Sequence, residues 1–243
     1  MNVYPVNALE ACSLNSPQKE SYALLRDLHN RYLDYQVDFN RHEIELSGQW
    51  DRAIPVDCFI IANTNAISGT IKYLAGNDVL FEKDLIINEF INIYSIVNEY
   101  GIIQKKSIDH FLLTLKGNEN ISIGLIYIGE TWVLPRFLIK PKKYLQLRNE
   151  NGRTFSGQAM GIPVETLIAF SVQFARIDNL NKKLCDNYIN GVQTVIPHII
   201  DPYPKAHDEF EPFFATVSDY GEQEKREEDG FYWNFNIAWQ EAK

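Results

Sequence analysis

The densest group of side chains that could ligate a metal or catalyse a reaction lies in PHIIDPYPKAHDEFEP, residues 197–212. Imidazoles and carboxylates this close together can ligate a divalent metal or form an acid–base pair. No spacing in the segment matches a metal motif, however, and acidic, proline-rich sequence is also typical of an exposed loop. We therefore expect no metal site and no cofactor. The residues concerned are His198, Asp201, His207, Asp208, Glu209 and Glu211.

Motifs for nucleotide binding and for nucleophilic catalysis are missing from the chain. The sequence contains no GxxxxGK[ST] loop and no GxGxxG after a strand. Ser156 lacks the preceding glycine of a GxSxG elbow, and the five histidines form no HxH, HxxxH or HExxH pair. Whether the protein is an enzyme stays open from the sequence, but the missing catalytic set favours a non-catalytic protein.

A basic segment stands out in a chain whose formal net charge is −9. Only Glu150 opposes its positive side chains, and aromatic residues are interleaved with them. Three interpretations remain: protection of a sheet edge or internal docking on the acidic residues 208–229, a protein partner, or a groove for single-stranded nucleic acid. The residues that we expect to bind a partner or a phosphate are Arg136, Lys140, Lys142, Lys143, Tyr144, Arg148 and Arg153.

Two long helices are expected to position these residues. Ser16-Pro17 is a typical helix start, and apolar residues then recur at helical spacing up to Leu33, which predicts a helix over 17–33. A second apolar stripe, which includes Leu167, Phe170 and Phe174, predicts a helix over 163–190. We also favour a helix within the ambiguous segment 80–100.

The strands are expected to form antiparallel hairpins. Residues 35–47 are interpreted as one hairpin that turns near Asn40-Arg41, and residues 57–62 as a buried strand. Gly129-Glu130 and Asn151-Gly152 are favourable two-residue turns, each between two apolar or alternating segments. These signals predict a meander over residues 110–157.

Composition places the chain among ordinary globular proteins, with 45% hydrophobic and 23% charged residues. The three cysteines form no CxxC pair, so we expect reduced thiols. We also expect no secretory leader, no membrane span and a cytoplasmic location. The predicted fold class is α+β, a single domain over residues 1–243 with a β-meander against long amphipathic helices. Residues 1–15 are expected to be loose, and 201–243 to form a loop-rich acidic tail that ends in a strand.

These features favour a non-catalytic protein that binds another protein or assembles with it. An inhibitor or immunity-type protein and a structural subunit of a larger particle both fit, and homo-oligomers are compatible with either. One alternative is an enzyme acting on a phosphate-bearing substrate, with the basic segment and the 198–211 cluster as its site. Another is a nucleic-acid-binding module that uses the basic 136–153 hairpin alone.

Overall fold

The computed structural model describes residues 1–17, 25–29, 36–135, 142–153, 159–193, 196–204, 211–227 and 230–242. Strands dominate this part of the chain, and its one regular α-helix longer than a turn is α2 (Asn179–Val192). The expected α+β class is therefore wrong, and the protein is mainly β. None of the helices in the described residues is long and apolar enough to cross a membrane.

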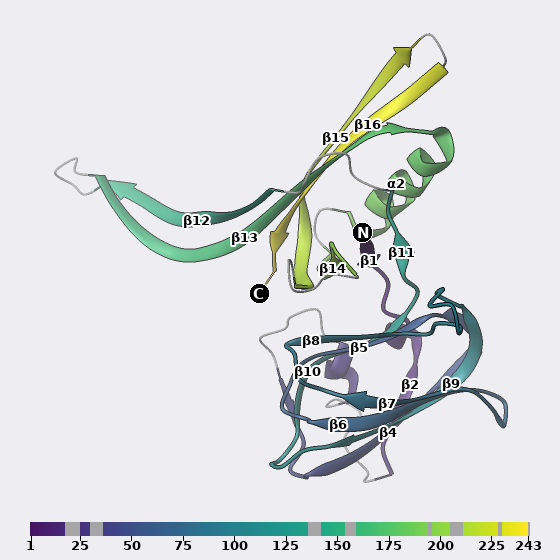
Figure 1. The fold of residues 1–243 in the computed structure, drawn as a ribbon. Helices are drawn as coiled ribbons and strands as arrows, with labels where there is room; N and C mark the ends of the chain where they lie inside the picture. Colours follow the sequence, from purple (N-terminus) through teal and green to yellow (C-terminus); the bar gives the residue numbers. More distant parts are fainter. Residues whose placement is uncertain are drawn as a thin grey trace.

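Two antiparallel sheets form a β-sandwich in the first half of the chain (Figure 1). One sheet has four strands in the order β3 (Val37–Asp38), β10 (Ser122–Gly129), β5 (Cys58–Thr64) and β8 (Ile91–Ser95). The other has five strands in the order β2 (Ser13–Asn15), β4 (Glu43–Val56), β9 (Lys106–Lys116), β6 (Ser68–Ala75) and β7 (Asp78–Ile86).

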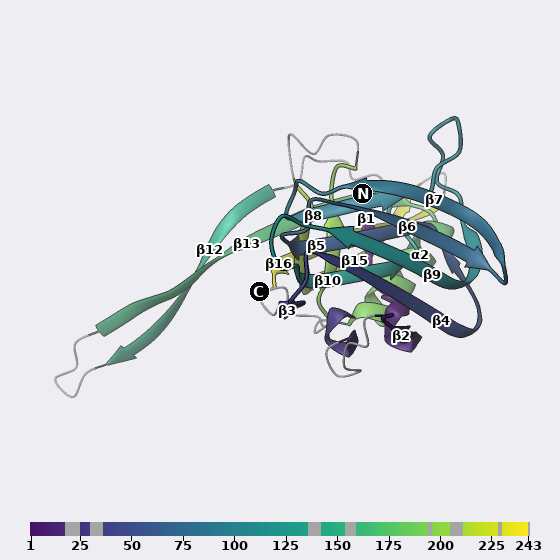
Figure 2. The same ribbon diagram turned by 90° about the horizontal axis from the view of Figure 1, so that it is seen from below.

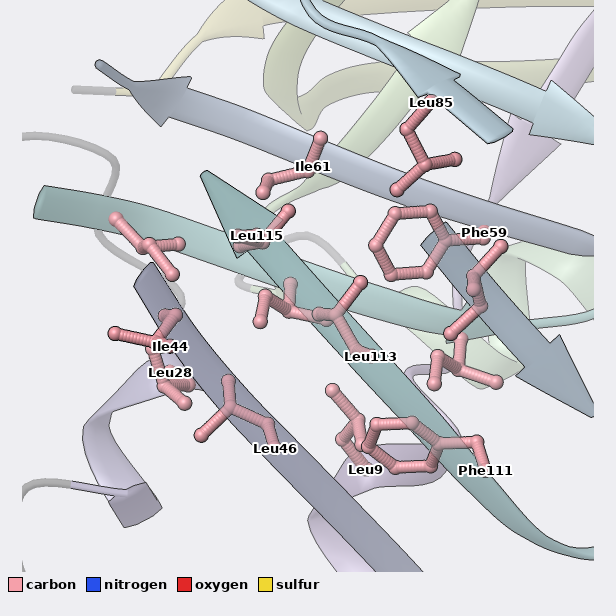
Figure 3. Close-up of a cluster of buried hydrophobic side chains, with 14 of the residues drawn as sticks. Leu9, Leu28, Ile44, Leu46, Phe59, Ile61, Leu85, Phe111, Leu113 and Leu115 are labelled. Atoms are coloured by element: carbon pink, nitrogen blue, oxygen red, sulfur yellow. The ribbon is translucent and has the colours of Figure 1, made fainter. Parts of the chain in front are cut away.

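The sandwich core lies between these sheets. Figure 3 shows Ile44 and Leu46 from β4, Phe59 and Ile61 from β5, and Phe111, Leu113 and Leu115 from β9 in this cluster. Alternate residues of each strand point inward, as the period of two of a β-strand requires. Leu9 and Leu28 close the cluster from the short 3-10 turns η1 (Ala8–Ala11) and η2 (Asp27–His29).

A third sheet has seven strands and packs on the sandwich. Its order is β11 (Trp132–Val133), β1 (Asn2–Tyr4), β14 (His198–Asp201), β15 (Phe213–Glu227), β16 (Gly230–Glu241), β13 (Ala159–Ile177) and β12 (Lys142–Arg153). Neighbouring residues face opposite layers. Ile200 and Phe213 join the core under α2, whereas Ile199 and Phe214 pack against the outer face of the four-stranded sheet.

The helix expected over 163–190 is wrong for its first half, because β13 is a strand of 19 residues. Residues 162, 164, 166, 168, 170, 172 and 174 are all β-branched or aromatic, a period of two that favours a strand. Leu167, Phe170 and Phe174 also match a helical stripe, and that match concealed the shorter period. Only residues 179–192 are helical.

The expected hairpins are wrong as well, although most of the strands exist. β3 and β4 belong to opposite sheets, so residues 35–47 do not pair with each other. β10 pairs with β3 and β5, whereas β11 pairs with β1, so Gly129-Glu130 joins two sheets. β12 runs through Asn151-Gly152 without turning, and the predicted meander over 110–157 is thereby excluded.

Other expectations have mixed outcomes. The buried strand at 57–62 is confirmed as β5, while the helix in 80–100 is wrong because β7 and β8 occupy that segment. Of the helix expected over 17–33, residues 25–29 are helical and residues 18–24 and 30–33 lie outside the described part. Residues 1–15 carry β1, η1 and β2. The tail forms β15 and β16, of which β16 is the final strand that we expected.

Candidate functional site

The candidate site is an arm made of residues 145–153 from β12 and 159–168 from β13. β16 pairs with β13 only from Ala169 onward, and β12 is the last strand of its sheet. Over the length of the arm, the described residues therefore pair only across the hairpin itself, from Leu145↔Ile168 to Arg153↔Ala159. Figures 1 and 2 both show it leaving the body of the molecule. Nine or ten extended residues reach about 30 Å.

A register shift bends the arm. Arg148 pairs with Glu165 and Asn149 pairs with Pro163, so Val164 has no partner across the hairpin. An extra residue of this kind bends a strand and increases its local twist. Pro163 has no N–H to donate, and proline is tolerated at an edge or a bulge. The bulge and the proline together are consistent with the curved course of the arm in Figure 1.

The structure gathers most of the predicted binding residues on one strand. Lys142, Lys143, Tyr144, Arg148 and Arg153 all belong to β12, whereas Arg136 and Lys140 lie outside the described residues. Lys142 and Lys143 pair with Ser171 and Phe170, where β13 is also paired with β16. The basic residues therefore run from the base of the arm to the last residue of β12.

The acidic residues that were considered for internal docking lie elsewhere. Residues 219–227 belong to β15, which is separated from β12 by β16 and β13. In Figure 1 the ends of the β15–β16 hairpin and of the arm point in different directions from the sheet. Backbone pairing between the basic and the acidic strand is thus not formed within the described part of one chain.

The 198–211 cluster does not form a second half of this site. His198 lies in β14, four strand positions from β12, which corresponds to about 19 Å at the base of the sheet. Its Nε2 lies 2.5 Å from the hydroxyl of Tyr188, and its Nδ1 lies 2.9 Å from the carbonyl of Ile196. Burial lowers the pKa of His198 to about 4. Residues 207–209 are outside the described part.

Asp57 is a second buried titratable group, at the corner between β4 and β5. Its Oδ1 accepts hydrogen bonds of 2.7 Å from both the backbone N and Oγ1 of Thr131. Burial raises the pKa of Asp57, and the bonds from Thr131 partly offset that effect. These contacts anchor the connection from the sandwich to β11. Among the described residues, no three His, Cys, Asp or Glu side chains gather closely enough to hold a metal ion.

A hollow lies at the junction of the sandwich and the seven-stranded sheet, lined among others by Tyr4, Tyr127 and His198. Its volume of about 20 Å³ accommodates roughly one water molecule. Pockets for small organic ligands are more than tenfold larger. This hollow therefore offers no room for a substrate in the described structure.

Two strands were not predicted from the sequence. They are β13, which was expected to be helical, and β15, which was expected to be part of a loop-rich tail. The signal for β13 was the period of two over residues 162–174. For β15 the signal was weak, because its charged segment SDYGEQEKRE is also typical of a loop. Charged residues are nevertheless also common on strands at the edge of a sheet.

Comparison with known proteins gives similarity at the level of structure. No family model and no curated protein matches the sequence. Solved structures that are similar include SpGH29, with a TM-score of 0.44 and 7% identity. They also include a fucose binding module from Streptococcus pneumoniae, with a TM-score of 0.39 and 11% identity. A third is CpGH89CBM32-6 from Clostridium perfringens, with a TM-score of 0.37 and 10% identity.

The matched regions cover about half of this chain, 53% for SpGH29 and 51% for the other two. They span 29% of SpGH29, so the chain corresponds to less than a third of that protein. They span 96% of the fucose binding module and 98% of CpGH89CBM32-6. With identities of 7–11%, the chain is similar to these proteins in part of its fold.

Proposed function

We propose that this protein is a non-catalytic binding protein that assembles with a protein surface through the arm. The observation that carries the proposal is the arm itself, a two-stranded hairpin whose outer edges have no backbone partner among the described residues. Its β12 strand carries the basic residues and Tyr144 that the sequence marks for binding.

An isolated two-stranded hairpin is at best marginally stable in water. Both edges of such a hairpin present unpaired N–H and C=O groups, which pair readily with another strand. The sequence of the β13 half is also rich in apolar residues, namely Ala159, Met160, Ile162, Val164, Leu167 and Ile168. Docking against a partner would supply both backbone hydrogen bonds and apolar contacts, as in recognition by strand addition.

The buried titratable groups support a non-catalytic role. His198 lies in the core with both ring nitrogens at hydrogen-bond distance from protein groups, and Asp57 is bonded to Thr131. Each is thus used to hold elements together. Neither lies beside β12, where the basic side chains would meet a phosphate.

Site-specific photo-cross-linking tests the proposal. A benzophenone amino acid in place of Leu147 puts the probe on the arm, and the same amino acid in place of Leu112 is the matched control on β9. Leu112 is 44% exposed on the five-stranded sheet. In the cells that make the protein, irradiation should give protein adducts from position 147 in clear excess over position 112.

A second variant keeps the test independent of the probe. Replacing residues 145–168 with Asn-Gly joins Tyr144 to Ala169, which already pair across the hairpin, through a favourable two-residue turn. This chain should fold and lose its association with partners. Equal adducts from both probe positions, adducts with nucleic acid in place of protein, or undiminished association of the shortened chain would contradict the proposed function.

A further inference from the structure

We propose that the partner of the arm is a second copy of this chain, and that β12 of one copy pairs with residues 216–227 of β15 in the next. This inference rests on the proposed function and adds the identity of the partner. It is drawn from two unpaired strand edges, their lengths and their opposite charges.

The first observation is the open edge of β15. β14 pairs with β15 only at Phe213, Phe214 and Ala215, and β15 continues to Glu227 with β16 on its other side. No backbone hydrogen bond within the described residues reaches the outer edge of residues 216–227. Alternate residues along such an edge present an N–H and a C=O to a new strand.

The second observation is that the two open edges match in length. β12 runs from Lys142 to Arg153, which is 12 residues, and its outer edge is the end of the seven-stranded sheet. Residues 216–227 of β15 also make up twelve positions. Pairing of β12 with this edge would join the sheets of two molecules without leaving a long unpaired remainder on either strand.

The third observation is the charge of the two strands. β12 contains four basic residues against Glu150, whereas residues 216–227 contain four acidic residues against Lys225 and Arg226. Among the three ways of joining these edges, β12 with β12 opposes two basic strands, and β15 with β15 opposes two acidic strands. Like charges across a strand pair are destabilising. Only β12 with β15 is attractive, in a protein whose net charge of −9 otherwise opposes self-association.

Within one chain β12 and β15 are not neighbours, so we expect their pairing to form between two chains. β16 and β13 lie between β15 and β12, and the two hairpins diverge in Figure 1. When an edge of one molecule pairs with a different edge of the next molecule, the contact is heterologous, and it leads to a closed ring or an open filament. The expected assembly is therefore head-to-tail, and each copy contributes one arm and receives another.

A charge-swap experiment tests the inference on the full-length chain. The variant of β12, called the arm variant, carries Lys142→Glu and Lys143→Glu at the base of the arm. The edge variant carries Glu224→Lys and Glu227→Lys on β15, and the control carries Arg52→Glu and Lys83→Glu on exposed sandwich positions. In sedimentation velocity the wild-type chain and the control should self-associate alike. Each of the other variants alone should associate roughly tenfold or more weakly, because like charges then meet at the contact.

Mixing the arm variant with the edge variant should restore association, since acidic arms then meet basic edges and basic arms meet acidic edges. The double variant with all four changes should associate on its own. Circular dichroism of each chain checks the fold. If a variant unfolds, the alternative test is carbodiimide cross-linking of a mixture of light and heavy isotope-labelled wild-type chains. The expected products are peptides in which Lys142 or Lys143 of one label is joined to Glu224 or Glu227 of the other.

Three results would overturn the inference. The first is a wild-type chain that stays monomeric up to high micromolar concentration while position 147 still cross-links to a different protein, which leaves the proposed function intact. The second is self-association that the arm and edge variants leave unchanged. The third is weakened association that mixing does not restore. Loss of all protein adducts at position 147 would instead count against the proposed function itself.

Discussion

The hydroxyl of Tyr188 in α2 lies 2.5 Å from Nε2 of His198 in β14, inside the core that joins the helix to the seven-stranded sheet. The same hydroxyl accepts a hydrogen bond of 2.7 Å from Nε1 of Trp239 in β16. Burial keeps the imidazole of His198 neutral, and its Nδ1–H donates to the carbonyl of Ile196, so Nε2 accepts a hydrogen bond from the Tyr188 hydroxyl. This chain of bonds requires a neutral histidine.

Stability should accordingly fall with acid. The pKa of His198 in the folded state is about 4, below its usual value near 6.5, because burial disfavours the charged ring. Between these values the unfolded chain binds a proton that the folded chain does not. The free energy of unfolding should therefore decrease by about 3 kcal/mol as pH falls through this window. Urea unfolding at a series of pH values measures the slope.

His198→Gln is the matched variant, because glutamine offers an acceptor and a donor but does not titrate. Its stability should change less steeply between pH 6.5 and pH 4 than that of the wild type. If the free energy of unfolding changes with pH equally steeply in both proteins, other groups dominate the acid response, and His198 is not kept neutral by the folded core.

Asp57 and Thr131 should be coupled in stability. Thr131→Val removes the 2.7 Å bond from Oγ1 to Oδ1 of the buried Asp57 carboxylate and leaves the bond from the backbone N of residue 131 in place. The expected cost is about 1–3 kcal/mol, since a buried acceptor loses a partner. Asp57→Asn combined with Thr131→Val should cost less than the sum of the two single changes. Strict additivity in this double-mutant cycle would argue against the coupling.

Two glycines should respond to alanine in opposite directions. At Gly69 an added Cβ would lie 2.3 Å from the backbone oxygen of Thr114, so Gly69→Ala must displace β6 from β9 and should destabilise the sandwich by more than 1 kcal/mol. At Gly191, inside α2, a Cβ meets no atom within 4 Å. Gly191→Ala should raise stability by about 0.5–1 kcal/mol. Thermal melts of both variants check the signs.

Phe214 should couple the sandwich to the seven-stranded sheet. It is buried with Tyr4, Ile60, Tyr127 and Ile199 between these layers. Phe214→Ala should cost about 3–5 kcal/mol, whereas Phe90→Ala, at a position 58% exposed, should cost little. The wild type should unfold in one calorimetric transition, which also tests the expectation of a single domain. Two separate transitions in the wild type would refute both the coupling of the sandwich to the seven-stranded sheet and the single domain.

Local sequence determined where several strands lie. The run CFIIA is buried on both faces in β5, and alternation over residues 162–174 marks β13. The basic strand of the arm was also visible, since Lys142, Lys143, Tyr144, Arg148 and Arg153 stand together in an acidic chain. These features depend on residue type and short-range spacing, which the sequence carries directly.

The pairing of the strands was decided only by the tertiary structure. β1 at the N-terminus pairs with β14 and β11, and Asn151-Gly152 lies within a strand in spite of its strong preference for a turn. A turn preference is worth on the order of 1 kcal/mol, whereas the burial of Phe170, Val172 and Phe174 under α2 contributes several times that amount. Burial across distant segments therefore overrides local turn signals, and it fixes which strands meet and which two edges, on β12 and β15, are left open.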